Sequence, residues 1–236
     1  MEETTTTAVA ENLARIKDQI AEAAKKAGRA PEEVRLVAVS KTKPVEMIRE
    51  AFEAGQRIFG ENRVQELKAK YEEFPEPEWH LVGNLQRNKV KYIVEWVDLI
   101  HSLDSERLMR ELNKRAKNAG RRYVDCLLQV NISQEEQKHG TGTREVVQLL
   151  DALPNYPNVR VQGLMGIAEF TQDQDVVRWQ FSWLRETLFK LQEQFGTTEQ
   201  LELKELSMGM SGDFPLAIEE GATLVRVGSS IFGARN

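Results

Sequence analysis

Short apolar runs alternate along the chain with longer amphipathic segments, and this alternation predicts strands that are each followed by a helix. Eight runs are apolar enough on both faces to form strands of a parallel sheet covered by helices. They span residues 34–39, 57–59, 80–83, 99–103, 125–131, 160–167, 204–208 and 223–227. The pattern indicates an α/β protein.

The helices are predicted by apolar residues that recur three and four positions apart. The opening helix has its apolar positions at Leu13, Ile16, Ile20 and Ala24. A second helix is expected to have Pro44 at its first position, where a missing N–H costs no hydrogen bond. Further helices are predicted over residues 63–71, 87–94, 106–118, 144–153, 176–195 and 214–220, so that seven of the eight strands precede a long helix.

Eight alternations in one chain favour a closed single (β/α)8 TIM barrel, with the opening helix as an addition to it. An open doubly wound sheet is the alternative, although such sheets more often carry fewer strands. No linker-like segment divides the chain, so we expect one domain over residues 8–236. Residues 1–7 are predicted to be a frayed, disordered N-terminus.

Composition narrows the function classes. The 236 residues are 41% hydrophobic and 29% charged, with a net charge of −5 and both signs interspersed. This balance is that of a soluble globular protein and argues against nucleic acid or membrane as the main partner. A single cysteine, Cys126, excludes an internal disulfide framework and is expected to be an inert buried thiol. Neither a signal peptide nor a zinc-binding spacing is found, and a cytoplasmic location is expected.

Lys41 is the first candidate for chemistry, because it follows the apolar strand over residues 34–39. In a barrel of this type, the working residues lie at the C-terminal ends of the strands. An amine held among apolar walls has a lowered pKa and becomes a better nucleophile toward an aldehyde. The alternative is a solvated lysine at the start of a helix, and the local sequence favours neither interpretation over the other.

Two loops rich in glycine and serine form the second candidate. Residues 207–213 follow the seventh strand, and residues 226–230 include the end of the eighth. These are the strands whose loops often bind phosphate in this fold, together with a short extra helix, for which residues 231–233 are available. Either loop alone would more simply be an ordinary turn, but their occurrence together favours a phosphate site.

Other polar residues near strand ends allow two interpretations each. Arg226 lies in an apolar strand, so its charge requires an acidic partner or a ligand. Asn62 could bind a ligand or cap the next helix, and capping is the commoner role. His80 and His101 are expected to be hydrogen-bonded core residues rather than bases, and His139 lies in a polar segment.

Several segments together resemble one known family. They are residues 37–44 (VAVSKTKP), 59–62 (FGEN), 79–83 with Gln86 and Lys89, 207–211 (SMGMS) and 225–228 (VRVG). In combination they resemble the YggS/PROSC (PLPBP) family of pyridoxal phosphate homeostasis proteins, which includes the cyanobacterial PipY. The resemblance runs from about Leu13 to the C-terminus. Arg63 and Leu81 depart from it, since the commoner residues there are tyrosine and an aromatic.

The resemblance implies a monomeric barrel like the N-terminal domain of alanine racemase, with pyridoxal 5′-phosphate (PLP) as cofactor. It implies a Schiff base on Lys41, a position near the ring for Asn62, and Arg226 opposite the pyridine nitrogen. The phosphate would lie among residues of the two loops, namely Ser207, Met208, Gly209, Ser211, Gly228 and Ser229. The family is regarded as having no established catalytic activity and as acting in vitamin B6 and amino-acid homeostasis.

The implied position of Arg226 and the chain's tyrosines favour a carrier over an enzyme. A cation opposite the pyridine nitrogen would weaken the ring as an electron sink. A racemase also needs a second acid or base, often a tyrosine from an added domain, for which this chain has no room. The four tyrosines, Tyr71, Tyr92, Tyr123 and Tyr156, are all predicted on helices or loops.

We therefore expect a protein that holds PLP reversibly and transiently contacts PLP-dependent apo-enzymes. A racemase-type PLP enzyme of low or specialised activity is the alternative. A barrel enzyme for another phosphorylated substrate is a third hypothesis.

Overall fold

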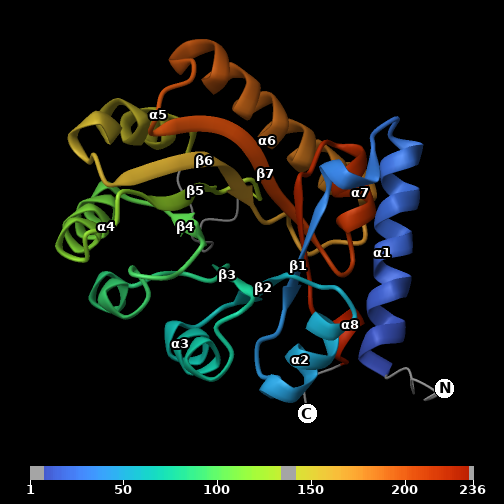
Figure 1. The fold of residues 1–236 in the computed structure, drawn as a ribbon. Coiled ribbons are helices and arrows are strands. Elements are labelled where there is room, and N and C mark those ends of the chain that lie inside the picture. The colour runs from blue at the N-terminus through green and yellow to red at the C-terminus, as the bar shows by residue number, and fades with distance from the viewer. Residues whose placement is uncertain (1–7, 134–141, 234–236) are drawn as a thin grey trace.

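Eight parallel strands close into a barrel in the computed structural model, which describes residues 8–133 and 142–233. The strands are Arg35–Val39 (β1), Ile58–Glu61 (β2), Glu78–Leu81 (β3), Leu99–Leu103 (β4), Val124–Val130 (β5), Val159–Gly166 (β6), Leu201–Met210 (β7) and Leu224–Val227 (β8). They lie in chain order around the barrel, and β8 pairs with β1 to close it (Figure 1). The predicted TIM barrel is confirmed, and the open sheet is excluded.

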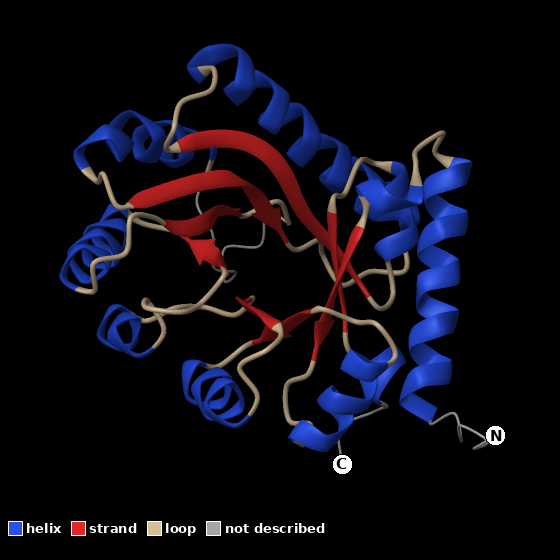
Figure 2. Ribbon diagram, in the orientation of Figure 1, coloured by secondary structure: helices blue, strands red, loops and turns tan. Residues whose placement is uncertain are grey.

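Helices surround the strands on the outside of the barrel (Figure 2). The α-helices are Ala8–Lys26 (α1), Val45–Glu53 (α2), Val64–Glu73 (α3), Glu106–Asn118 (α4), Thr143–Ala152 (α5), Gln174–Phe195 (α6), Phe214–Glu219 (α7) and Ser229–Phe232 (α8). Short 3₁₀ segments span Pro31–Glu33 (η1), Arg87–Tyr92 (η2) and Leu153–Asn155 (η3). The added helix α1 packs against α2, α7 and α8, on the side of the barrel where β8 meets β1 (Figure 1).

Apolar side chains form two layers. The larger lies between the strands and the helices, and the apolar positions predicted for α1 are buried in it. A smaller inner layer fills the barrel with one side chain from each of six strands, Val37, Ile58, Leu99, Leu127, Met165 and Leu224, and with Val82, which directly follows β3. The barrel is thus a packed core whose free space lies at its ends.

Two predicted elements differ from the structure. The segment after β3 forms a 3₁₀ helix, η2, rather than the predicted α-helix over residues 87–94. Val90, Tyr92, Ile93 and Val94 are β-branched or aromatic, and such side chains disfavour an α-helix. Pro44 precedes α2 in an extended conformation, one residue before the position predicted for it.

Two sequence predictions concern residues that the structure does not describe. Residues 1–7 lie outside the described residues, so the division into a disordered end and one domain over residues 8–236 stays a prediction. His139 also lies outside them. In the described part of the chain, none of the helices has the length and apolar character needed to span a membrane.

Candidate functional site

A cavity of about 460 Å³ lies at the C-terminal ends of the strands, between the ends of β1, β2, β7 and β8. Its volume falls within the range of about 300–1,000 Å³ that small-molecule sites usually occupy. Six of the nine residues predicted to bind the cofactor line it: Lys41, Asn62, Ser211, Arg226, Gly228 and Ser229. Met210, which belongs to the predicted loop motif but was not predicted as a cofactor contact, lines it as well.

The segment that carries Lys41 is held from below by a buried ion pair. Lys70 of α3 lies 2.6 Å from Glu61 at the end of β2, and their side chains are 7% and 0% exposed. Lys70 Nζ also donates to the carbonyl oxygen of Ser40, at 2.8 Å, while the Ser40 hydroxyl donates to Glu61 Oε1. The carbonyl and the side chain of Ser40, the residue before Lys41, are therefore both held in place.

The residue after Lys41 has an unusual backbone. Thr42 has φ of 65°, a left-handed conformation that residues with a Cβ rarely adopt. Its N–H donates to Glu66 Oε1, and the same carboxylate oxygen accepts from Lys70 Nζ at 2.8 Å. Strained backbone of this kind is found preferentially at functional sites, where surrounding contacts maintain it. Lys70 and Glu66 thus link α3 to the two neighbours of Lys41, Lys70 to Ser40 and Glu66 to Thr42.

Burial raises the pKa of the Glu61 carboxyl, and the adjacent Lys70 ammonium opposes that shift. One carboxylate oxygen, Oε1, accepts from Lys70 and Ser40, whereas Oε2 is buried with no hydrogen-bond partner in the part of the chain that the structure describes. The charge of Glu61 consequently depends on Lys70.

Arg226 is a buried cation beneath the cavity. It is 5% exposed, and burial lowers its pKa to about 10. Its Nη1 donates to Ser207 Oγ at 2.5 Å, and its Nη2 donates to the Gly166 carbonyl at 3.0 Å. Within residues 8–133 and 142–233, no carboxylate forms an ion pair with it, although Asp213 is near enough to favour its charged form. The sequence predicted either an acidic partner or a ligand for Arg226, and the described residues provide no ion pair to an acidic partner.

The two Gly/Ser loops meet at the cavity. The Ser211 hydroxyl accepts from the Gly228 N–H and from the Ser229 hydroxyl, both at 3.4 Å. A Cβ at Gly228 would lie 2.7 Å from the carbonyl oxygen of Val39, so only glycine allows this loop to lie against the end of β1. The predicted short helix after the eighth strand is present as α8.

Three predicted cofactor contacts lie behind the cavity rather than on its surface. Ser207, Met208 and Gly209 belong to β7 and do not line the cavity. Ser207 is fully buried and contacts Arg226 instead. Gly209 has φ of +88°, and a Cβ there would lie 2.6 Å from Ala217 of α7. Direct phosphate contacts by these residues stay a prediction.

Asn62 lies in the cavity lining, and the residue that caps α3 is Arg63, so the capping interpretation of Asn62 is wrong. His80 and His101 are buried and hydrogen-bonded, as predicted. The structure also confirms Cys126 as a buried free thiol, and burial raises its pKa. The four tyrosines lie in or next to helices and loops, as predicted.

Some lining residues were not identified from the sequence as site residues. Asp213 lies in the cavity, and burial raises the pKa of its carboxyl. Phe170, which is 97% exposed, and Ile167 come from the segment after β6. Lys43 was quoted only as part of the motif around Lys41. Phe170 and Ile167 could not be identified from one sequence, because an apolar loop residue carries no signal that it lines a cavity.

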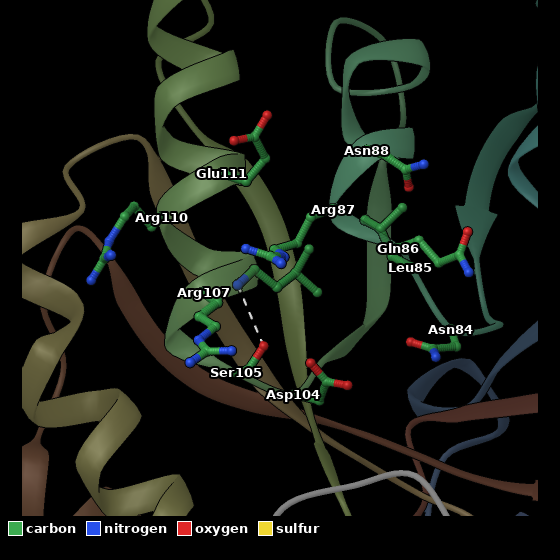
Figure 3. A pocket seen from close by; sticks show the side chains of 11 residues that line it. Asn84, Leu85, Gln86, Arg87, Asn88, Asp104, Ser105, Arg107, Arg110 and Glu111 are labelled. Atoms are coloured by element: carbon green, nitrogen blue, oxygen red, sulfur yellow. Dashed lines mark hydrogen bonds between the residues drawn. The ribbon is translucent and has the colours of Figure 1, made fainter.

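A larger cavity, of about 720 Å³, lies between η2 and the start of α4 (Figure 3). Figure 3 shows Arg87 reaching toward α4, with Asp104 and Asn84 below it in the view. Most of its polar side chains are exposed, and it contains none of the predicted site residues. A buried charge beside a lysine identifies the smaller cavity as the better candidate, because perturbed ionisable groups cluster at functional sites.

Comparison with known proteins gives consistent matches over nearly the whole chain. The family model for the N-terminal domain of alanine racemase matches residues 12–236. The pyridoxal phosphate homeostasis protein of Aquifex aeolicus is 44% identical over 228 residues, covering 95% of this chain and 97% of its own. That of Escherichia coli K12 is 41% identical over 240 residues, covering 97% of both chains. The structure of PipY from Synechococcus elongatus with PLP bound has a TM-score of 0.83 at 41% identity, covering 95% of this chain and all of that one.

The ion pair beneath Lys41 predicts a large effect on stability. Lys70→Met leaves the Glu61 carboxylate buried without its cation, and we expect the free energy of unfolding to fall by about 3–5 kcal/mol. Lys68→Met is the matched control, because Lys68 pairs with Glu72 on the exposed face of the same helix. That change should cost less than about 1 kcal/mol. Urea denaturation measures both, and equal losses would contradict the role given to Lys70.

The buried imidazole of His101 predicts a pH dependence. Burial, followed by the nearby His80 and Arg226, lowers the pKa of His101 well below its ordinary value of 6.5. Below pH 6.5 the unfolded chain binds a proton there that the folded chain does not, so acid favours unfolding by about 1.4 kcal/mol per pH unit. The stability difference between wild type and His101→Gln should therefore change with this slope between about pH 6 and 5 in urea titrations. A difference that is constant with pH would contradict the expectation.

Proposed function

The chain belongs to the family of pyridoxal phosphate homeostasis proteins, and we propose that it binds PLP in the cavity at the C-terminal ends of β1, β2, β7 and β8. The observation that carries this proposal is Arg226, a buried cation that faces the same cavity as Lys41 and forms no ion pair with a carboxylate of the described residues. Such a charge is costly in the barrel interior unless a polar group of a ligand completes its hydrogen bonds.

The chemistry of the cavity fits each part of PLP. Lys41 supplies the amine that an aldehyde requires, with the amine nitrogen replacing the aldehyde oxygen as one water leaves. Hydroxyls of Ser211 and Ser229 and the glycine backbone at Gly228 suit a phosphate. Arg226 can only donate hydrogen bonds, so it suits a pyridine nitrogen that accepts one. Asn62 is available beside the ring.

We assign the β7 residues to a supporting role. Ser207 holds Arg226, whereas Met208 and Gly209 pack beneath the loop that carries Ser211. On this proposal the phosphate is bound mainly by residues 211 and 228–229, and any contribution of residues 207–209 passes through these neighbours.

Holding the cofactor accounts for the site better than using it in catalysis. Bound PLP supplies an electron sink for carbanions, but an unprotonated pyridine nitrogen opposite Arg226 weakens it. Among the described residues that line the cavity there is no tyrosine to act as a second acid or base. We therefore propose a carrier that acts in vitamin B6 and amino-acid homeostasis and passes PLP to apo-enzymes, as a cytoplasmic monomer.

The covalent link is predicted to depend on one lysine. Wild-type protein mixed with PLP should acquire an absorbance band that borohydride removes, and Lys41→Ala should acquire none. Lys91→Ala, at an exposed position on η2, controls for nonspecific reaction with surface amines and should behave as wild type. A band lost in Lys43→Ala but kept in Lys41→Ala would contradict the assignment, since both lysines line the cavity.

The carrier role predicts slow chemistry with amino acids. Holo-protein incubated with a panel of L-amino acids in D₂O should exchange their α-protons far below about 1 s⁻¹, the low end of ordinary enzyme turnover. NMR of the amino acids measures the exchange, with PLP alone as the background. Exchange at an enzymatic rate would favour the racemase-type alternative. The match to the N-terminal domain of alanine racemase is the reason for testing that alternative.

A further inference from the structure

A row of polar side chains crosses the inside of the barrel from β3 to β8. Glu78 Oε1 lies 2.8 Å from His80 Nε2, and His80 Nδ1 lies 2.9 Å from His101 Nε2. His101 Nδ1 lies 2.9 Å from Ser207 Oγ, which accepts from Arg226 Nη1 at 2.5 Å. The row joins β3 and β4 to β7 and β8, which lie on opposite sides of the closed strand order (Figure 1).

The two ends of the row differ in exposure. His80, His101 and Ser207 are fully buried, and Arg226 lines the cofactor cavity. Glu78 is the first residue of β3, at the opposite end of the barrel from the cavity, and its side chain is 40% exposed. The row therefore connects the proposed cofactor site to a carboxylate that reaches solvent at the far end.

Arg226 fixes the direction of every hydrogen bond in the row. A guanidinium has donors and no acceptor, so Ser207 Oγ must accept from it. The Ser207 hydroxyl is then free to donate to His101 Nδ1, which leaves the proton of that ring on Nε2. His101 Nε2–H donates to His80 Nδ1, and His80 Nε2–H donates to the Glu78 carboxylate. Each of the three middle residues makes one donation and one acceptance, so the buried row is fully satisfied.

The opposite direction leaves an unsatisfied group. If Glu78 donated to His80, each ring would carry its proton on Nδ1, and Ser207 would accept from both His101 and Arg226. The Ser207 hydroxyl proton would then have no acceptor among the described residues, which is costly in the barrel interior. It would also require a protonated Glu78, whereas the hydrogen bond from His80 lowers the pKa of that carboxyl.

We propose that Glu78, His80, His101 and Ser207 are positioning residues that form one directed hydrogen-bond relay and hold the Arg226 guanidinium toward the cofactor. The relay presents an oxygen lone pair to Arg226 and ends on a negative charge, so its dipoles stabilise the buried cation in addition to the nearby Asp213 carboxyl. Within the described residues, Arg226 uses two of its five N–H groups on Ser207 and Gly166, so three donors remain for a ligand. The effect on the cofactor rests on the proposed function, whereas the direction of the relay does not.

The direction can be measured without any cofactor. Two-bond ¹H–¹⁵N correlation spectra of the apo-protein at neutral pH report which ring nitrogen carries the proton. The relay requires both His80 and His101 to be neutral with the proton on Nε2. A proton on Nδ1 of either ring, or a doubly protonated ring, would overturn the proposal even if PLP binds.

The effect on the cofactor is tested by removing the link next to Arg226. Ser207→Ala should weaken PLP binding about tenfold, because a charged donor loses its acceptor, and should shift the absorbance maximum of the bound cofactor. Ser102→Ala is the matched control, since Ser102 is another buried serine of the barrel strands whose hydroxyl has no partner among the described residues. It should bind PLP as wild type does. Equal effects of the two variants would overturn the relay.

A second variant acts at the far end and preserves the buried packing. Glu78→Gln keeps an acceptor for His80 and removes the charge, so the proton should remain on Nε2 of both rings while PLP binding weakens by about threefold. An unchanged affinity and spectrum would show that the relay does not reach the cofactor and would overturn that part of the proposal. If wild-type protein binds no PLP at all, the proposed function fails, and the tautomer measurement still decides the relay.

Discussion

Arg226 holds a positive charge inside a packed barrel, and the polar side chains of the interior are arranged around that charge. The guanidinium loses most of its hydration at 5% exposure, and its hydrogen-bond acceptors in the described part of the chain are two neutral oxygens. A site of this kind is stable only if every polar group that supports the charge is itself satisfied. The charge also makes the cavity above it suitable for a ligand that accepts hydrogen bonds.

The barrel topology brings the other parts of the site to that cation. Because β8 pairs with β1, Val37 lies in register with Arg226, and the segment that carries Lys41 emerges beside the loop at Gly228. On the other side of β1, the ion pair between Lys70 and Glu61 fixes the peptide before Lys41. The lysine, the cation and the Ser211 loop are therefore held by three separate sets of contacts on rigid elements.

The sequence was sufficient for much of this site because its signals are local. Lys41 and Arg226 lie at the ends of apolar strands, and the Gly/Ser loops follow the two strands that most often bind phosphate in this fold. The family resemblance then assigned to these positions the roles that are proposed for them. The eight strands were also predictable, whereas η2 was not, since the apolar spacing of its residues resembles that of an α-helix.

The supports of the site could not be derived in the same way. His101 and Ser207 are 106 residues apart and meet across the barrel, so no spacing in the chain relates them. In the sequence Lys70 looks like any other helix lysine, and only the packing of α3 shows that it is buried. Asn62 has the sequence pattern of a helix cap, but Arg63 occupies the capping position of α3. These roles depend on strand register and on which face of each element is turned inward.

Binding of PLP as proposed depends most on the covalent role of Lys41. Its most direct test is to reduce the PLP-loaded wild-type protein with borohydride, digest it, and locate the pyridoxyl group by mass spectrometry. The account predicts a single major modified peptide in which the group is attached to Lys41. Attachment mainly to Lys43 or to surface lysines such as Lys89 and Lys91, or no stable attachment, would contradict it.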